Sequence, residues 1–145
     1  MLLRGTFLGI CSGFVLGLMM KWFESLSSVK VYTLFLNVDF IPLLGDYIWP
    51  EWIEFFFHQI IAVIIGLLYV FILEKYLSNR IKSKFILAFI LTFPTVFLYF
   101  PLAVLAIKDV PDPANIQAFG LWAAAHFIYF LSLPFFYWIA DHKNN

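Results

Sequence analysis

Charged side chains are scarce in this sequence of 145 residues, where they make up 12% of the chain, against about 25% in soluble domains. Apolar residues account for 63% and aromatic residues for 21%, so too few polar side chains remain to cover a globule in water. A water-soluble domain is therefore excluded, and the composition predicts an integral membrane protein. The nine basic and nine acidic residues cancel, so no net positive field attracts nucleic acid.

Cysteine and the common catalytic motifs are also lacking. The single cysteine, Cys11, cannot form an internal disulfide, and no cluster of cysteine and histidine has zinc-ligand spacing. The sequence has no nucleophilic serine or cysteine beside a histidine, no glycine-rich phosphate loop and no HExxH motif. We therefore expect no catalytic residue, no metal and no cofactor, and the sequence does not predict an enzyme.

Four long apolar runs are the main feature that is present. A helix needs about 20 residues to cross the hydrocarbon of a membrane, and Pro94 and Pro101 are expected to kink the third run. The sequence thus predicts an all-α fold, a polytopic four-helix transmembrane bundle that forms one domain over residues 1–145. The predicted spans are residues 3–23, 52–74, 85–107 and 116–140.

The first run has an alternative interpretation as a secretory signal peptide, because Arg4 precedes it and Ser25 to Ser27 loosely resemble a cleavage site. The run is long for the core of a signal peptide, and its glycines are spaced for helix packing. We therefore favour a first transmembrane span.

The basic residues are distributed unevenly between the two sides of the predicted bundle. Because basic residues near spans are retained in the cytoplasm, the side with more of them is predicted to be cytoplasmic. Both termini then lie in the cytoplasm, and the protein is a multi-pass protein of the cell (inner, cytoplasmic) membrane. Six of the nine basic residues are on this side: Arg4, Lys75, Arg80, Lys82, Lys84 and Lys143.

The connection between the first two spans, residues 24–51, is too apolar for an ordinary polar loop. Pro42, Gly45 and Pro50 break any long helix in it, and its aromatic residues suit the depth of the lipid headgroups. We expect it to lie on the outer membrane surface as an interfacial loop. Three acidic residues in it lack the spacing of a calcium loop and are expected to be solvated: Asp39, Asp46 and Glu51.

Small residues recur at every fourth position in the first two spans. Glycines form a stripe along the first, which lets another backbone approach closely, and in the second Ala62 and Gly66 follow the same step after Glu54 and His58. We expect these two faces to meet. The alternatives are that the stripe contacts a second copy of the chain or a partner membrane protein, or that it lines a pore. The glycine stripe consists of Gly5, Gly9, Gly13 and Gly17.

Two histidines, His58 in the second span and His126 in the fourth, lie within apolar runs in the predicted outer half. An ionisable group at the centre of a membrane costs roughly 2.5 to 3.5 kcal/mol, so each histidine needs a reason to be there. Glu54 stands one helical turn from His58, within reach to orient the ring. Lys21 and Glu24, at the end of the first span, complete a candidate polar cluster.

Three interpretations of the histidines remain open. In the first, they hydrogen-bond across helices and only hold the bundle together. In the second, they form a proton-sensitive site, because imidazole changes its charge at about pH 6.5. In the third, they ligate a metal or a haem, for which two histidines and one carboxylate from separate helices are a weak motif.

Pieces of the chain resemble the YagU-like inner membrane proteins of bacteria. The end of the first span, Lys21-Trp22-Phe23-Glu24, resembles the end of the family's opening span. The stretch from His58 to Glu74 resembles the family's histidine-led span, and His126 resembles the histidine that opens its final aromatic span. The resemblance implies a protein of the cytoplasmic membrane with a connection to acid tolerance and no known substrate.

Two functions are expected on these grounds. The first is a small membrane protein that senses protons or conducts an ion during acid or envelope stress, through the polar cluster. The alternative is a noncatalytic scaffold or accessory subunit of a membrane complex, which would use the glycine stripe. The expected partners are membrane lipid and either a second copy or a partner membrane protein, with no nucleic acid. An enzyme acting on lipid would need a nucleophile that the sequence does not provide.

Overall fold

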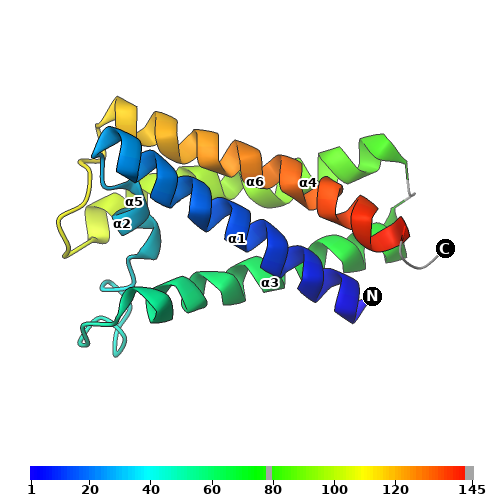
Figure 1. Cartoon of the computed structure of the whole chain (residues 1–145), viewed down its shortest axis with the longest axis horizontal. Helices are drawn as coiled ribbons and strands as arrows, with labels where there is room; N and C mark the ends of the chain where they lie inside the picture. Colours follow the sequence, from blue (N-terminus) through cyan, green and yellow to red (C-terminus); the bar gives the residue numbers. More distant parts are fainter. Residues whose placement is uncertain (78–79, 143–145) are drawn as a thin grey trace.

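The computed structural model describes residues 1–77 and 80–142, and within them it contains helices and no strand (Figure 1). Four segments are long and apolar enough to cross a membrane, at Leu2–Ser27, Glu51–Tyr76, Ile81–Leu105 and Ile116–Asp141. This confirms the predicted all-α bundle of four spans, and the chain is a multi-pass membrane protein. The helices are α1 (Leu2–Ser27), α2 (Val31–Leu36), α3 (Glu51–Tyr76), α4 (Ile81–Phe97), α5 (Tyr99–Leu105) and α6 (Ile116–His142).

The two ends of the bundle differ in what they carry. The start of α1, the end of α3, the start of α4 and the end of α6 lie at one end of the bundle, which we call the terminal end (Figure 1). The other end, the loop end, carries α2 and the segments that follow α2 and α5. Of the six basic residues that the sequence assigns to the terminal end, Lys143 lies outside the described residues.

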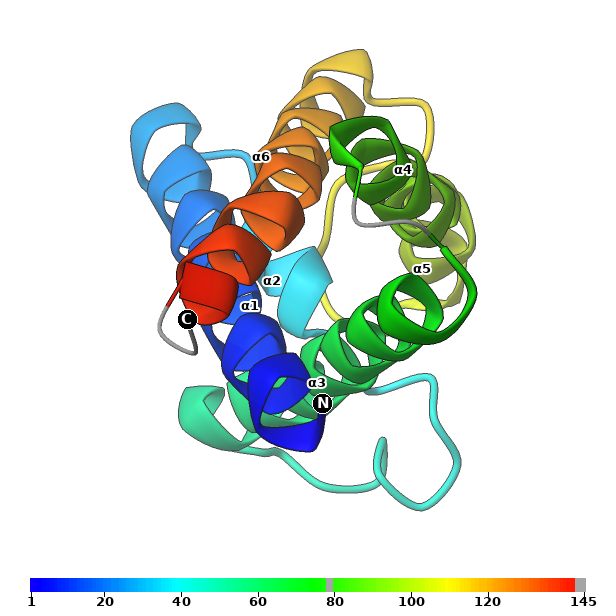
Figure 2. The ribbon, with the colours of Figure 1, turned by 90° about the vertical axis from the view of Figure 1, so that its right-hand side faces the viewer.

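Helix α1 lies between α3 and α6, and it packs most extensively against α3 and next against α6. Helix α4 packs mainly against α6, whereas α3 and α4 make few contacts with each other. Viewed from the terminal end, the ribbons of α3 and α4 lie apart, and α2 is visible farther in (Figure 2). The bundle is therefore tight around α1 and splayed between α3 and α4.

The tight packing of α1 on α3 depends on glycine. A Cβ atom added to Gly9 would lie 2.5 Å from the Cα of Val63 and 2.6 Å from the carbonyl oxygen of Ala62. One added to Gly66 would lie 2.5 Å from the carbonyl oxygen of Gly5 and 2.6 Å from the nitrogen of Gly9. These are backbone atoms, which cannot move aside as a flexible side chain does. The two backbones are thus in direct contact.

The third span is broken into two helices where the sequence predicts one kinked helix over residues 85–107. Helix α4 ends at Phe97, Leu98 forms the junction, and α5 begins at Tyr99. The break places Pro101 in the first turn of α5, where backbone N–H groups have no partner within the helix, so the missing N–H of proline costs little. Pro94 stays inside α4.

The connection between α1 and α3 differs from its prediction over its first half. Residues 31–38 do not lie on the surface of the bundle. Val31 and Leu34 are fully buried and Phe35 is 5% exposed, because α2 packs among α1, α3 and α6. The apolar side chains of α2 fill the space that the splayed helices leave at the loop end. The second half, residues 39–50, stays outside, and Ile48 is fully exposed.

Replacement of Gly9 by alanine tests the direct backbone contact. We expect Gly9→Ala to lower the free energy of unfolding by about 1–3 kcal/mol, as overpacking does in a tight core, measured by titration with a denaturing detergent. Gly120→Ala is the matched control, because an added Cβ there meets nothing within 4 Å and alanine gains up to about 1 kcal/mol of helix propensity. Equal effects of the two substitutions would contradict the contact.

Candidate functional site

The carboxylate of Glu24, near the end of α1, holds the start of α2. It accepts hydrogen bonds from the backbone N–H groups of Tyr32 at 2.7 Å and Thr33 at 2.9 Å, and from the Thr33 hydroxyl at 2.9 Å. These N–H groups lie in the first turn of α2, where they have no partner within the helix and favour a negative charge. Glu24 therefore serves as the anchor of α2.

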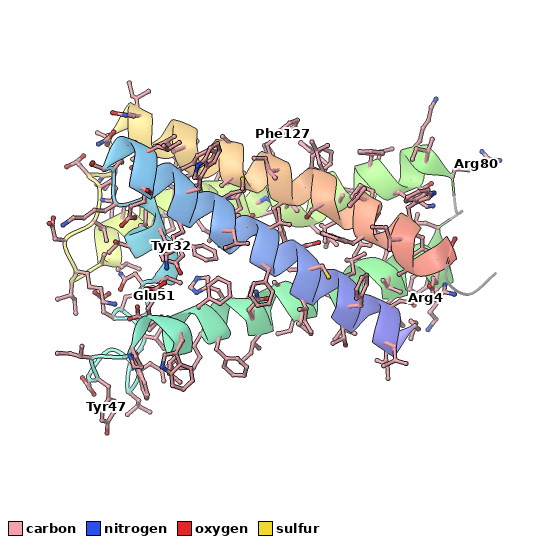
Figure 3. All side chains as sticks on the ribbon, viewed as in Figure 1. Arg4, Tyr32, Tyr47, Glu51, Arg80 and Phe127 are labelled. Atoms are coloured by element: carbon pink, nitrogen blue, oxygen red, sulfur yellow. The ribbon has the colours of Figure 1, made fainter. Side chains whose placement is uncertain are left out.

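Lys21 is paired with Glu51 at the first turn of α3. The Lys21 ammonium lies 2.6 Å from the Glu51 carboxylate, which also accepts a hydrogen bond of 2.9 Å from the Tyr32 hydroxyl. Figure 3 shows Tyr32 and Glu51 close together at the loop end. Burial raises the pKa of the Tyr32 phenol above its ordinary value, and the hydrogen bond to Glu51 adds to this. The Tyr32 hydroxyl thus remains a donor at physiological pH.

Glu54 forms its ion pair with Lys108, which follows α5, rather than with His58. The Glu54 side chain is 8% exposed and that of Lys108 is 38% exposed. The sequence places Glu54 one turn from His58, but the nearby ammonium is the stronger partner for a buried carboxylate. The pair ties the end of the third span to α3 at the loop end.

The two histidines use the same hydrogen-bonding arrangement. Nδ1 of His58 lies 3.2 Å from the carbonyl oxygen of Glu54, and Nδ1 of His126 lies 2.9 Å from that of Trp122. A carbonyl oxygen only accepts, so each Nδ1 carries the hydrogen, and Nε2 of the neutral ring is left as an acceptor. The ring of Phe35 packs 4.2 Å from that of His58, and the ring of Trp122 packs 4.7 Å from that of His126.

Both histidines line one cavity of about 480 Å³, which we call the histidine cavity. It lies between α3, α6 and the third span, and α2 with residues 37–44 covers it. Among the residues that the structure describes, no Asp, Glu, Lys or Arg side chain lines this cavity. Its walls are mainly apolar, and the polar residues on them are Asn37, His58, Thr95, His126 and Tyr129.

A second hollow of about 390 Å³, which we call the charged mouth, lies at the loop end. Helix α2 contributes to both spaces, since Tyr32, Thr33 and Leu36 line the charged mouth and Phe35 lines the histidine cavity. Along α3, Glu54 lines the charged mouth and His58 lines the histidine cavity. Helix α2 is therefore the partition between the two. The charged residues of the mouth are Lys21, Glu24, Glu51, Glu54 and Lys108.

The predicted polar cluster is thus divided by the fold. Lys21, Glu24 and Glu54 lie in the charged mouth, and His58 and His126 lie in the histidine cavity on the other side of α2. Sequence reasoning missed Lys108 as the partner of Glu54, because an isolated lysine after the third span gives no indication of what it faces. It also missed Tyr129 and Asn37, which look like ordinary packing and loop residues in the sequence.

The glycine stripe and Asp39, one of the acidic loop residues, have partners within the chain. Gly5 and Gly9 lie against the backbone of α3, Gly13 against Gln59 and Ala62, and Gly17 against the ring of Phe55. This face of α1 is therefore covered by α3. One carboxylate oxygen of Asp39 accepts the backbone N–H groups of Ile107 and Lys108. Within the described residues, no three His, Cys, Asp or Glu side chains are grouped so that they could hold a metal ion.

Comparison with known proteins gives no relative from which a role could be transferred. No family model, no curated protein and no solved structure matches the chain. The resemblance to the YagU-like proteins therefore stays a prediction, and the function has to be argued from the geometry of the two spaces.

The two ion pairs of the charged mouth are expected to differ in strength. A double-mutant cycle with Glu54→Gln and Lys108→Met should give a coupling of about 1–2 kcal/mol, because Glu54 is buried but Lys108 is partly screened by solvent. The cycle with Glu51→Gln and Lys21→Met should give less than about 1 kcal/mol, because both side chains are 56% exposed. Unfolding free energies in detergent measure both couplings. A larger coupling for Glu51 with Lys21 than for Glu54 with Lys108 would contradict the argument from the burial of Glu54.

The anchoring of α2 by Glu24 gives a separate prediction. Glu24→Gln removes the charge that the first turn of α2 faces, so we expect the backbone amides of Tyr32 and Thr33 to exchange hydrogen for deuterium several-fold faster. Glu74→Gln is the control, since Glu74 bonds Arg4 at the terminal end. Unchanged exchange in Glu24→Gln would show that packing alone holds α2.

Proposed function

We propose that this chain is a proton-responsive protein of the cytoplasmic membrane, in which protonation of His58 and His126 displaces α2. The orientation is part of the proposal. It is supported by the basic residues at the terminal end and by the positive-inside rule, which together place both termini in the cytoplasm. The histidine cavity and the charged mouth then belong to the outer half, and the charged mouth faces the external medium while α2 separates the histidine cavity from it.

One observation carries the proposal: two imidazole rings from different spans line the same cavity, and no acidic side chain among the described residues lines it with them. Each ring bonds the backbone of its own helix, so neither bond holds two helices together. This favours a responsive role over the interpretation of the histidines as cross-helix fasteners. Protonation of either ring would place a positive charge against apolar walls, which is costly unless water enters.

Helix α2 is the element best placed to move in response. Phe35 of α2 packs against His58, so water reaches the ring most directly if α2 withdraws. The charged and titratable groups nearest this boundary are Glu54 on α3, paired with Lys108, and Glu24 on α1, bonded to α2. Tyr129 lines the cavity from α6, and from the third span the polar group is the uncharged Thr95. A charged histidine would therefore attract Glu54 and the water of the charged mouth.

We favour a proton response over passage of a hydrated ion because of the side chains that line the histidine cavity. An ion path needs polar groups along its length, whereas the histidine cavity is mainly apolar and closed towards the mouth by α2. The resemblance to the YagU-like proteins, with their connection to acid tolerance, agrees with this choice. The scaffold alternative loses the surface on which it was based, because α3 covers the glycine stripe.

The test is hydrogen exchange of residues 31–38 in liposomes, from about pH 7.5 to about pH 4, a range that includes the free imidazole value of about 6.5. After correction for the intrinsic pH dependence of exchange, we expect several-fold faster exchange at acid pH in the wild type. We expect a much smaller change in the variant with His58→Gln and His126→Gln, since glutamine keeps a polar amide but takes up no proton.

Two comparisons make this result interpretable. Only the difference between the wild type and the double variant counts, because every ionisable group other than the two histidines is the same in both proteins. Ser12→Ala, which removes a buried polar atom of α1 outside the cavity, should behave like the wild type. The same acid response in the double variant would refute the proposal. Proton flux into the same liposomes is then measured, because a proton conductor would produce such a flux and a sensor would not.

A further inference from the structure

The histidine cavity has hydrogen-bonding groups that the described residues do not satisfy. The hydroxyl of Tyr129 and the side-chain nitrogen Nδ2 of Asn37 are buried and have no hydrogen-bond partner in the part of the chain that the structure describes. Tyr129 is 1% exposed and Asn37 is 2% exposed, and both residues line the cavity. A buried polar group without a partner costs about 1–3 kcal/mol, which suggests that a bound molecule completes these bonds.

The hydrogen-bonding roles of the cavity residues restrict the chemistry of that molecule. The side-chain oxygen of Asn37 accepts from the backbone N–H of Asp39 at 3.1 Å, so its Nδ2 is left as a donor. Nε2 of each neutral histidine is an acceptor, as the bonds of Nδ1 require. A single hydroxyl group meets both needs, because it can donate to imidazole and accept from an amide.

The charge and shape of the cavity indicate the rest of the molecule. With no Asp, Glu, Lys or Arg among its described lining residues, the cavity has no counterion for a charged ligand. Its volume of about 480 Å³ lies within the range of small-molecule sites, which are mainly apolar with a few polar groups. The ligand is therefore uncharged and mainly apolar.

The route into the cavity runs through the side of the bundle. Three of its lining residues, Ile60 and Ile61 on α3 and Leu98 between α4 and α5, are 44%, 53% and 48% exposed. They lie where α3 and α4 make few contacts, and in a membrane such exposed aliphatic side chains face lipid tails. The cavity thus opens towards the hydrocarbon and not towards water.

We infer that the histidine cavity binds an uncharged single-chain lipid through a terminal hydroxyl group. The chain enters from the membrane between α3 and α4, and the hydroxyl lies among His58, His126, Tyr129 and Asn37. This site shares its histidines with the proposed proton response but does not require that response.

The test uses hexadecan-1-ol that carries a photoreactive diazirine in its chain, added to the full-length protein in liposomes at neutral pH. Its methyl ether, which accepts a hydrogen bond but cannot donate one, is the matched probe. Labelled peptides are identified by mass spectrometry. We expect the alcohol to label residues around Ile61 and Leu98 several-fold more strongly than the ether does, while both probes label the outer faces of the helices equally.

Two pairs of variants locate the site. Tyr129→Phe removes one hydroxyl from the cavity and should weaken competition by unlabelled alcohol about three- to tenfold, the worth of one hydrogen bond. Tyr137→Phe, on the same helix but outside the cavity lining, should have no effect. Ile61→Trp should block entry, whereas Ile64→Trp, equally exposed on α3 but not part of the lining, should not.

Equal labelling of the cavity by alcohol and ether, or labelling spread evenly over all exposed helix faces, would overturn the inference. The labelling test and the hydrogen-exchange test of the proposed function can fail independently of each other. If residues 31–38 respond to acid but the alcohol shows no preference for the cavity, only this inference fails. If the alcohol binds but the double histidine variant keeps the full acid response, only the proposed function fails.

Discussion

The direct contact between the backbones of α1 and α3 sets the positions of the other helices. Between membrane helices there is no hydrophobic driving force, so close packing of small residues supplies much of the attraction. Gly9 and Gly66 allow that approach, and α6 packs against α1 as well. Because α4 then packs on α6 and makes few contacts with α3, the bundle is left splayed on one side. The histidine cavity occupies that side.

Helix α2 converts this splayed bundle into a protein with two separate spaces. Its apolar residues are buried among three helices, and its first turn is held by a carboxylate of α1. The charged groups remain on one side of α2 and the histidines on the other. An element of six residues has far fewer contacts to break than a whole span, so it is easier to displace. This difference in attachment is why we assign the movement to α2.

The candidate site could be predicted from the sequence only in part. His58 and His126 were recognisable because an ionisable residue in an apolar run is costly and so needs a role. The partner of Glu54 was not recognisable, because Lys108 is far away in the sequence and only the fold brings it to α3. Tyr129 and Asn37 could not be recognised either, since burial without a hydrogen-bond partner is a property of the packed structure.

The number of spans, their approximate bounds and the helical character of the chain can be predicted from the amino-acid sequence, because the membrane requires long apolar runs whose backbone bonds are satisfied internally. The sequence also identified small residues that permit close packing. The burial of α2 inside the bundle, the position of the junction at Leu98 in the third span and the division of the polar cluster in two are seen in the packed structure alone. These features depend on which helices touch. The neighbours of an apolar span cannot be predicted from its own sequence, because the spans are similar in composition.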